Sequence, residues 1–338
     1  MAIDVTNNAI CLTGGFFCQT PTGIRFEGEA QAQVFCSLLS PVSGQSCGFT
    51  FGGRTASPGS ITDRCIDKFP FAADTNATGV GQFTQKSGGE GTTAGQSSSV
   101  SGYISGGGVP CSDIIEKYPF AAGAPTSDVG ELSSARTYAA GVTGSTSGYT
   151  IGGCGPVYDV IDKFPFSADA PATDVAEYGG TIMRSAGHSS ASTGYGSGGC
   201  YGPGKTGTIR KFPFAADSST SVVGSIGGRA DLAGQSSPEF GYASGGLDGG
   251  YAKTNKIDKF PFASDTNATD VGDLTQIRSC VAGQSSTVSG YTSGGTLPAP
   301  LGGGSTNTID KFPFASDTNA SDVGNLTQGR ATAGGHQV

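Results

Sequence analysis

The sequence predicts an all-β protein in which a four-stranded unit repeats as the blades of a β-propeller. A segment of Gly, an aromatic residue, two further residues and a Gly-Gly pair occurs six times along the chain, and a small residue precedes it in five copies. The segment Ile-Asp-Lys-Phe-Pro-Phe, or a variant of it, follows each pair. Successive pairs are about 46 to 54 residues apart, a period typical of propellers and other repeat arrays. The pairs are Gly52-Gly53, Gly106-Gly107, Gly152-Gly153, Gly198-Gly199, Gly245-Gly246 and Gly294-Gly295.

One copy of the unit shows how each strand is predicted. Arg278–Ser286 is rich in small and polar residues and is expected to form strand A, nearest the axis. Gly290–Gly295 is strand B, which ends in glycines that permit positive φ. Thr308–Phe314 is strand C, and the Asp- and Asn-rich Asp317–Asp322 is a turn. Val323–Thr327 is the short outer strand D.

The aromatic residues of strands B and C are expected to fill the space between neighbouring blades. Burying each of them would contribute roughly 1.5–3 kcal/mol, which makes them the main expected source of stability. The strand-B tyrosines are Tyr103, Tyr149, Tyr195, Tyr242 and Tyr291.

The two ends of the chain leave the number of blades open. Arg330–Val338 matches strand A and then stops, while Ala9–Gly15 resembles strand B and Thr22–Phe26 resembles strand C. The last strand A would then pair with the first B and C, so we predict six clear blades plus a degenerate seventh closed by the C-terminal strand. Residues 1–40 would form this degenerate blade or an N-terminal β-rich anchor, and 41–338 the propeller repeats. About one strand is missing from the first unit, so a six-bladed ring with a separate N-terminal anchor is the alternative.

Composition limits the class of protein. The net charge of −8 and a pI near 4.7 argue against nucleic-acid binding, which needs clustered Lys and Arg. No apolar run approaches the roughly 20 residues of a membrane span, and the N-terminus lacks the basic and apolar regions of a signal peptide. We therefore expect synthesis in a cytoplasm and no membrane insertion.

The 9 cysteines form no Cys-x-x-Cys motif and have no His at zinc-finger spacing. Free, half-buried thiols are expected. A Cys11–Cys18 or Cys36–Cys47 disulfide is the alternative for a protein that lies outside cells.

The repeat resembles the kelch family. The resemblance rests on Arg184 with Ala186–Ser189, on strands ending in Gly-Gly and on the following Ile-Asp-x-Phe strand, and it covers most of Gly48–Arg330. The chain departs from kelch in lacking the Trp of the third strand, where Phe-Pro-Phe stands instead. More narrowly, the repeat sequence GYTSGG…IDKFPFASDTNATDVGDLTQ resembles kelch-like repeats of marine bacteriophage virion proteins, especially tail-fibre-like ones.

Three motifs suggest chemistry but are better explained by structure. Gly199–Thr206 matches the phosphate-loop pattern, yet a β-strand rather than a helix is predicted to follow it. Asp74–Gly79 and Asp265–Asp270 resemble the start of a calcium loop, but Gln85 and Gln276 stand where a bidentate Glu is needed.

The two histidines also favour a structural interpretation. His188 stands where other units have Gln, as at Gln96, which indicates a structural role in strand A. With only two His and no compact acid cluster, we expect neither an enzyme nor a metal or other cofactor.

The loops between strands B and C vary from blade to blade, and this variation is the remaining indication of function. From Gly-Gly to Ile, the B–C loops hold 12, 7, 7, 9, 10 and 13 residues and differ in sequence, whereas the C–D turns are comparatively uniform. Variable loops on a rigid scaffold are where recognition usually occurs. We therefore predict a binding face that includes Arg54, Tyr158, Tyr201, Lys205, Asp248 and Tyr251.

The resemblance implies a non-enzymatic phage virion protein, either a decoration or a tail-fibre-like appendage subunit. Its expected partners are other virion proteins and host surface glycans, bound through the B–C loop face, and a homo-oligomer is compatible with this role. A cellular kelch-type interaction scaffold or a glycan-binding lectin is the alternative.

Overall fold

The computed structural model describes residues 46–55, 64–84, 92–108, 110–121, 126–155, 158–202 and 204–337, together with the backbone of four short N-terminal strands. The chain divides into two compact units, Met1–Gly44 and Gln45–Val338. The first unit contains one antiparallel sheet of β1 (Ile3–Thr6), β2 (Ala9–Leu12), β3 (Phe17–Thr20) and β4 (Gly23–Phe26).

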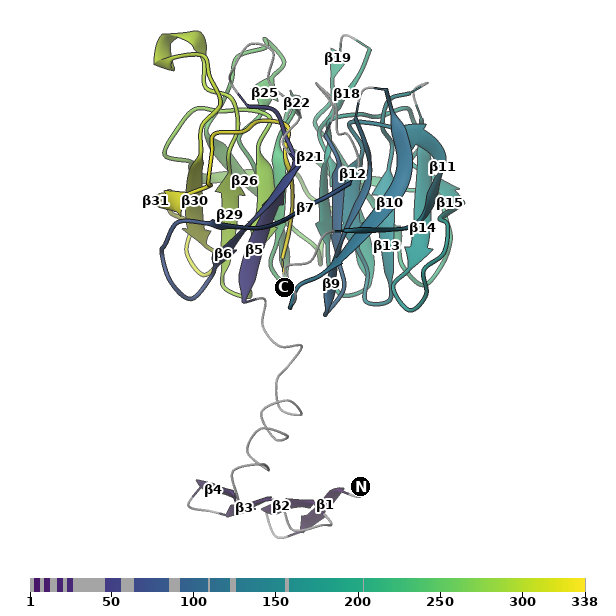
Figure 1. The fold of residues 1–338 in the computed structure, drawn as a ribbon, viewed down its shortest axis with the longest axis vertical. Coiled ribbons are helices and arrows are strands. Elements are labelled where there is room, and N and C mark those ends of the chain that lie inside the picture. The colour runs from purple at the N-terminus through teal and green to yellow at the C-terminus, as the bar shows by residue number, and fades with distance from the viewer. Residues whose placement is uncertain are drawn as a thin grey trace. The chain divides into compact units, whose positions relative to one another are not determined.

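The second unit is a six-bladed β-propeller, as the repeat predicts (Figure 1). Each blade is an antiparallel sheet of four strands, ordered from strand A to strand D. Blade 1 contains β32 (Gly334–Gln337), β5 (Cys47–Phe51), β6 (Cys65–Pro70) and β7 (Thr78–Gln82), and blade 2 contains β8 (Ala94–Ser97), β9 (Ser101–Gly107), β10 (Ser112–Pro119) and β11 (Ser127–Arg136). Blade 3 contains β12 (Ala140–Thr143), β13 (Ser147–Ile151), β14 (Val160–Pro165) and β15 (Thr173–Glu177), and blade 4 contains β16 (Ala186–Ser189), β17 (Thr193–Ser197), β20 (Thr208–Pro213) and β21 (Ser221–Ser225). Blade 5 contains β23 (Ala233–Ser236), β24 (Phe240–Ser244), β26 (Lys256–Pro261) and β27 (Thr269–Asp273), and blade 6 contains β28 (Ala282–Ser285), β29 (Ser289–Ser293), β30 (Thr308–Pro313) and β31 (Ser321–Asn325).

The ring closes differently from the seven-bladed prediction. The C-terminal β32 pairs with β5, with Gly334 opposite Phe51 and His336 opposite Phe49, and so supplies strand A of blade 1. The expectation of a seventh blade closed by this strand was therefore wrong, and the six-bladed alternative describes the ring. The Arg330 guanidinium lies 2.8 Å from the Asp67 carboxylate of β6. At the corresponding place in Thr22–Phe26 the sequence has Arg25, which cannot form that ion pair.

Glycines let the six A strands meet around the axis. An added Cβ at any of six glycines would clash with the carbonyl oxygen of the equivalent glycine in the neighbouring blade, and these clashes run once around the ring. Only glycine permits this close approach of backbones. The six are Gly95, Gly141, Gly187, Gly234, Gly283 and Gly335.

Aromatic rings fill the six blade junctions, which confirms the expectation from the sequence. The aromatic residue of each strand B stacks on the second Phe of the Phe-Pro-Phe or Tyr-Pro-Phe segment in the next blade, with ring centroids 4.5 to 5.1 Å apart. The stacked pairs are Phe49–Phe120, Tyr103–Phe166, Tyr149–Phe214, Tyr195–Phe262, Tyr242–Phe314 and Tyr291–Phe71.

The uniform C–D turns join each blade to the one before it. At all six junctions, the N–H of the residue that precedes strand D donates to a strand-D carbonyl of the preceding blade. At five junctions an Asp of the turn also forms an ion pair with a strand-C Lys of the preceding blade, as Asp265 does with Lys211 at 2.7 Å. The six hydrogen bonds are Thr126–Gln82, Ala172–Glu131, Thr220–Glu177, Ala268–Ser225, Ala320–Asp273 and Ala77–Asn325.

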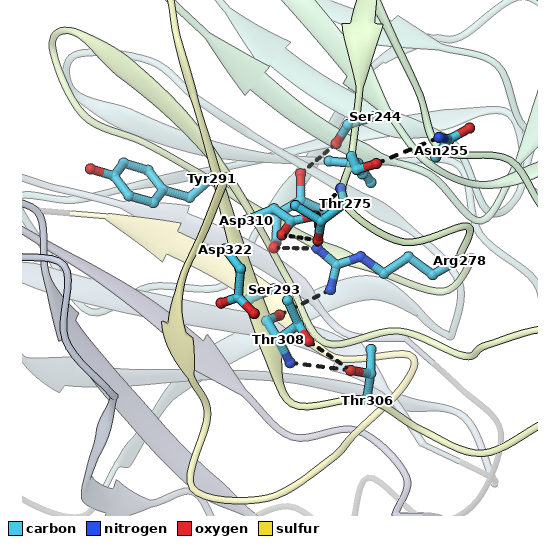
Figure 2. A network of polar contacts seen from close by, with 12 residues as sticks. Ser244, Asn255, Thr275, Arg278, Tyr291, Ser293, Thr306, Thr308, Asp310 and Asp322 are labelled. Atoms are coloured by element: carbon cyan, nitrogen blue, oxygen red, sulfur yellow. Dashed lines mark hydrogen bonds and ion pairs between the residues drawn. The ribbon is translucent and has the colours of Figure 1, made fainter. Parts of the chain in front are cut away.

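A buried arginine anchors strand A to strand C in four blades. In blade 6, the Arg278 guanidinium lies 2.9 Å from the Asp310 carboxylate, and both side chains are 0% exposed (Figure 2). The Thr275 N–H and hydroxyl donate to the same carboxylate at 2.9 and 2.6 Å. The other three pairs are Arg136–Asp162, Arg229–Asp258 and Arg330–Asp67.

Candidate functional site

The B–C loops gather at one end of the ring, which we call the loop face. In Figure 1 this is the upper end, where the two-stranded sheets β18–β19 and β22–β25 lie. Strand β18 (Cys200–Tyr201) pairs with β19 (Gly204–Lys205), and β22 (Arg229–Ala230) with β25 (Leu247–Asp248). A single turn of 3₁₀-helix, η1 (Ala299–Leu301), lies in the loop of blade 6.

A chain of backbone hydrogen bonds surrounds the axis at this face. Two residues before strand A, five blades have a non-glycine residue with φ between 56° and 61°. The N–H of each donates to the carbonyl of its counterpart in the preceding blade, over 2.8 to 3.1 Å, beginning at the Thr92 carbonyl. Left-handed backbone costs non-glycine residues roughly 1–2 kcal/mol each, which the inter-blade bonds offset. The five residues are Tyr138, Arg184, Asp231, Cys280 and Thr332.

Arg184 and Asp231 give this ring a charged sector between blades 4 and 5. The Arg184 guanidinium stacks over the Tyr138 ring with 4.3 Å to its centroid, and one of its nitrogens lies 3.1 Å from the Asp231 carboxylate. Asp231 is 2% exposed, and burial raises the pKa of its carboxyl above the usual value, although Arg184 opposes this. Arg184 itself is 34% exposed, so part of its guanidinium faces solvent.

Lys205 lies beside this sector. Its Nζ is buried, makes no hydrogen bond with any residue that the structure describes, and lies 3.2 Å from the centroid of the Tyr251 ring. Burying an ammonium without an acceptor is unfavourable, and a cation–π contact compensates only part of the cost. A hollow of about 180 Å³ adjoins it, lined among others by Arg184, Cys200 and Asp231. We call it the lysine hollow.

The charges of the lysine hollow favour an anion or a ligand rich in acceptor oxygens. Two cationic side chains, Arg184 and Lys205, face one carboxylate, Asp231. Burial raises the pKa of the Cys200 thiol, so at neutral pH Cys200 is a protonated wall residue rather than a nucleophile.

The structure brings some of the predicted binding residues together and separates others. Lys205 and Tyr251 are in contact, and Tyr201, which is 51% exposed, belongs to the same hairpin as Lys205. The Asp248 carboxylate instead accepts the N–H groups of Gly250 and Ala252, both at 2.9 Å, and so orders its own loop.

Arg54 and Tyr158 lie on other blades. Arg54 is exposed and forms a backbone bridge with Ala331, which lies in the segment that leads into strand A of the same blade. The Tyr158 ring lies 5.8 Å from the Arg136 guanidinium and helps to cover the buried ion pair of blade 3.

The motifs singled out in the sequence have structural explanations. The Gly199–Thr206 match folds as the β18–β19 hairpin and leads into the strand β20, not into a helix. Asp74 and Asp265 accept ion pairs from lysines of the preceding blade, Lys311 and Lys211. In the ranges that the structure describes, no group of three or more His, Cys, Asp or Glu is arranged to hold a metal ion.

The two histidines are fully buried in strand A. His188 Nε2 lies 2.7 Å from the Ser197 hydroxyl, but neither side chain reaches the surface. Burial lowers the pKa of His188 to about 4 and that of His336 to about 3, so both are neutral at pH 7. The six cysteines described in the propeller are half-buried, as expected, and Cys47, Cys111, Cys154, Cys200 and Cys280 are free thiols. Cys11 and Cys18 are opposite each other in β2 and β3.

Sequence reasoning used Arg184 only as part of the repeat resemblance and not as a site residue, and it missed Asp231 and the buried arginine pairs. A signal for the pairs was present in the sequence. The Arg four residues before strand A and the Asp of Ile-Asp-Lys-Phe occur together in four blades, and both are replaced in the other two, by Ile182 and Arg210 in blade 4 and by Glu90 and Glu116 in blade 2.

No protein-family model matches the chain, and no curated protein matches it. Among the residues described, no helix is long and apolar enough to cross a membrane.

Proposed function

We propose that this propeller is a non-enzymatic binding protein that recognises its partner through the loop face between blades 4 and 5. The observation behind the proposal is Lys205, whose ammonium is buried against Tyr251 and has no acceptor in the described ranges of the chain. An ammonium already stripped of water binds an incoming oxygen without paying that cost again. Arg184 adds a second cation at the same hollow.

The biological setting that we propose is a phage particle, in which the protein is a decoration or tail-fibre-like subunit. The proposed setting rests on the resemblance of the repeat sequence to marine phage virion proteins and on a fold suited to interaction scaffolds. Its partners would be other virion proteins or glycans of the host surface.

Immunogold labelling tests the setting. An antibody to the recombinant protein, applied to virus particles purified from infected host cultures, should place gold on a tail, a vertex or the capsid surface. Bare particles together with labelled cells would replace the virion role with a cellular scaffold or lectin.

A binding assay with a matched pair of lysine variants tests the site. Fluorescently labelled protein is titrated onto host cells and onto particles that lack the protein. Lys205→Met should lower the affinity at least tenfold. Lys256→Met removes a lysine of blade 5 that is 55% exposed and paired with Asp270, and should leave the affinity unchanged. Equal binding by wild type and Lys205→Met would refute the site.

A further inference from the structure

Blade 4 lacks the buried ion pair that holds strands A and C together in blades 1, 3, 5 and 6. The arginine four residues before strand A is Ile182, and the strand-C aspartate is Arg210. Because both positions differ at once, blade 4 has a cation where its neighbours have an anion.

The exchange leaves a hollow near the place that a guanidinium fills in other blades. In blade 6, Arg278 donates to the carbonyls of Gly294 and Thr308, at 2.8 and 2.9 Å. The equivalent residues in blade 4, Gly198 and Thr208, line a hollow of about 210 Å³. Its other walls include Tyr178, Tyr201, Thr206 and Arg210. We call it the blade-4 hollow.

Arg210 has no carboxylate partner within the described part of the chain. Its guanidinium donates to the Thr220 hydroxyl at 3.2 Å and lies 5.7 Å from the Tyr178 ring. It lies against Gly179, where φ is +84° and an added Cβ would lie 2.5 Å from Arg210 Nη1. By contrast, Arg136, Arg184, Arg229, Arg278 and Arg330 are each paired with an aspartate.

A half-buried guanidinium without a counter-charge is suited to a carboxylate, which it binds through two parallel hydrogen bonds. The half-exposed Tyr201 ring can stack on a sugar ring, and the hydroxyls of Thr206 and Thr208 can bond to sugar hydroxyls. The volume is below the roughly 300–1,000 Å³ of drug-sized sites, which favours a single sugar residue over a longer ligand.

We infer that the blade-4 hollow binds the carboxylate of an acidic sugar residue, with Arg210 as its anchor and Tyr201 against the sugar ring. This site is separate from the lysine hollow, since Tyr201 and Lys205 lie on opposite strands of the β18–β19 hairpin and line different hollows.

Isothermal titration with glucuronate and galacturonate tests the inference on the full-length protein. We expect one site, with binding at least tenfold tighter than for glucose or galactose and at least tenfold tighter than for glutamate. Equal binding of the neutral sugars would overturn the role of Arg210, and equal binding of glutamate would make this a site for acidic peptides rather than for sugars.

Two variants provide the matched control. Arg210→Gln should lower uronate affinity at least tenfold. The triple variant Tyr178→Leu, Ile182→Arg, Arg210→Asp introduces the residues that stand at Leu274, Arg278 and Asp310 in blade 6. It should fold with the new arginine side chain filling the hollow and should not bind uronate. Full uronate affinity in either folded variant would overturn the inference. Lys256→Met, the exposed control lysine, should bind uronate like wild type. The uronate titration tests the blade-4 hollow and the cell-binding assay with Lys205→Met tests the lysine hollow, so failure of one proposal and failure of the other are distinguishable.

Discussion

Removing one member of the Arg278–Asp310 pair should be among the most destabilising single changes in the propeller. Arg278→Met leaves the Asp310 carboxylate buried with bonds from Thr275 alone, and removes the donor from the carbonyls of Thr292, Gly294 and Thr308. Asp310→Asn leaves a fully buried guanidinium without a counter-charge. Breaking a buried pair in this way costs about 3–5 kcal/mol, so each variant should lose that much free energy of unfolding.

The double variant Arg278→Met, Asp310→Asn separates the pair from its surroundings. No buried charge remains in it, so its cost should fall short of the sum of the two single variants by about 2–3 kcal/mol. Strict additivity would show that the two side chains act independently, which contradicts their 2.9 Å contact.

Urea unfolding measures these costs. The chain has 11 Tyr and no Trp, so far-UV circular dichroism and tyrosine fluorescence are the two probes, and their transitions should coincide. Lys211→Met is the surface control, because it removes an ion pair with Asp265, which is 55% exposed, and should cost at most about 1 kcal/mol. If Arg278→Met costs no more than this control, the reasoning is refuted.

Two further predictions concern strand A. Burial holds the pKa of His188 at about 4, against about 6.5 in the unfolded chain, so the unfolded chain takes up the proton first as pH falls and stability declines below pH 6.5. His188→Gln introduces the residue that other blades have at this position. It should reduce by about 2 kcal/mol the fall in the free energy of unfolding between pH 8 and pH 5, measured by urea unfolding at each pH. An unchanged dependence of stability on pH would contradict this. Gly187→Ala would press a Cβ onto the Gly141 carbonyl, so it should lower the free energy of unfolding by about 1–3 kcal/mol or prevent ring closure. The control is Gly249→Ala, where nothing lies within 4 Å of the added Cβ, and its free energy of unfolding should stay within about 0.5 kcal/mol of wild type in the same assay.

The repeating parts of the fold were predictable because they depend on local residue patterns. Each Gly-Gly pair has the positive φ values that its position in strand B suggested, as at Gly294 with 65° and Gly295 with 110°. The stacking of Tyr291 on Phe71 across a blade junction follows from the alternation of side chains along the strands.

The non-repeating features were not predictable, because they depend on which segments meet in space. Closure by β32 and β5 depends on the match between Arg330 and Asp67, which lie 263 residues apart in the chain. The same holds for the contact of Lys205 with Tyr251, since nothing in either loop indicates that the two side chains meet.

The two ends of the propeller differ in what fixes their sequences. The C–D turns form the inter-blade bonds at all six junctions, so their residues are set by the neighbouring blade. The B–C loops form fewer inter-blade bonds. In blade 4 the residues beneath the loop, Ile182 and Arg210, also differ from those of other blades. Ile182 opposite an aspartate would bury an unpaired carboxylate, and Arg210 opposite an arginine would bring two guanidiniums together. In blade 4 the two positions differ together, and the exchange leaves a cation at the wall of a hollow on the loop face.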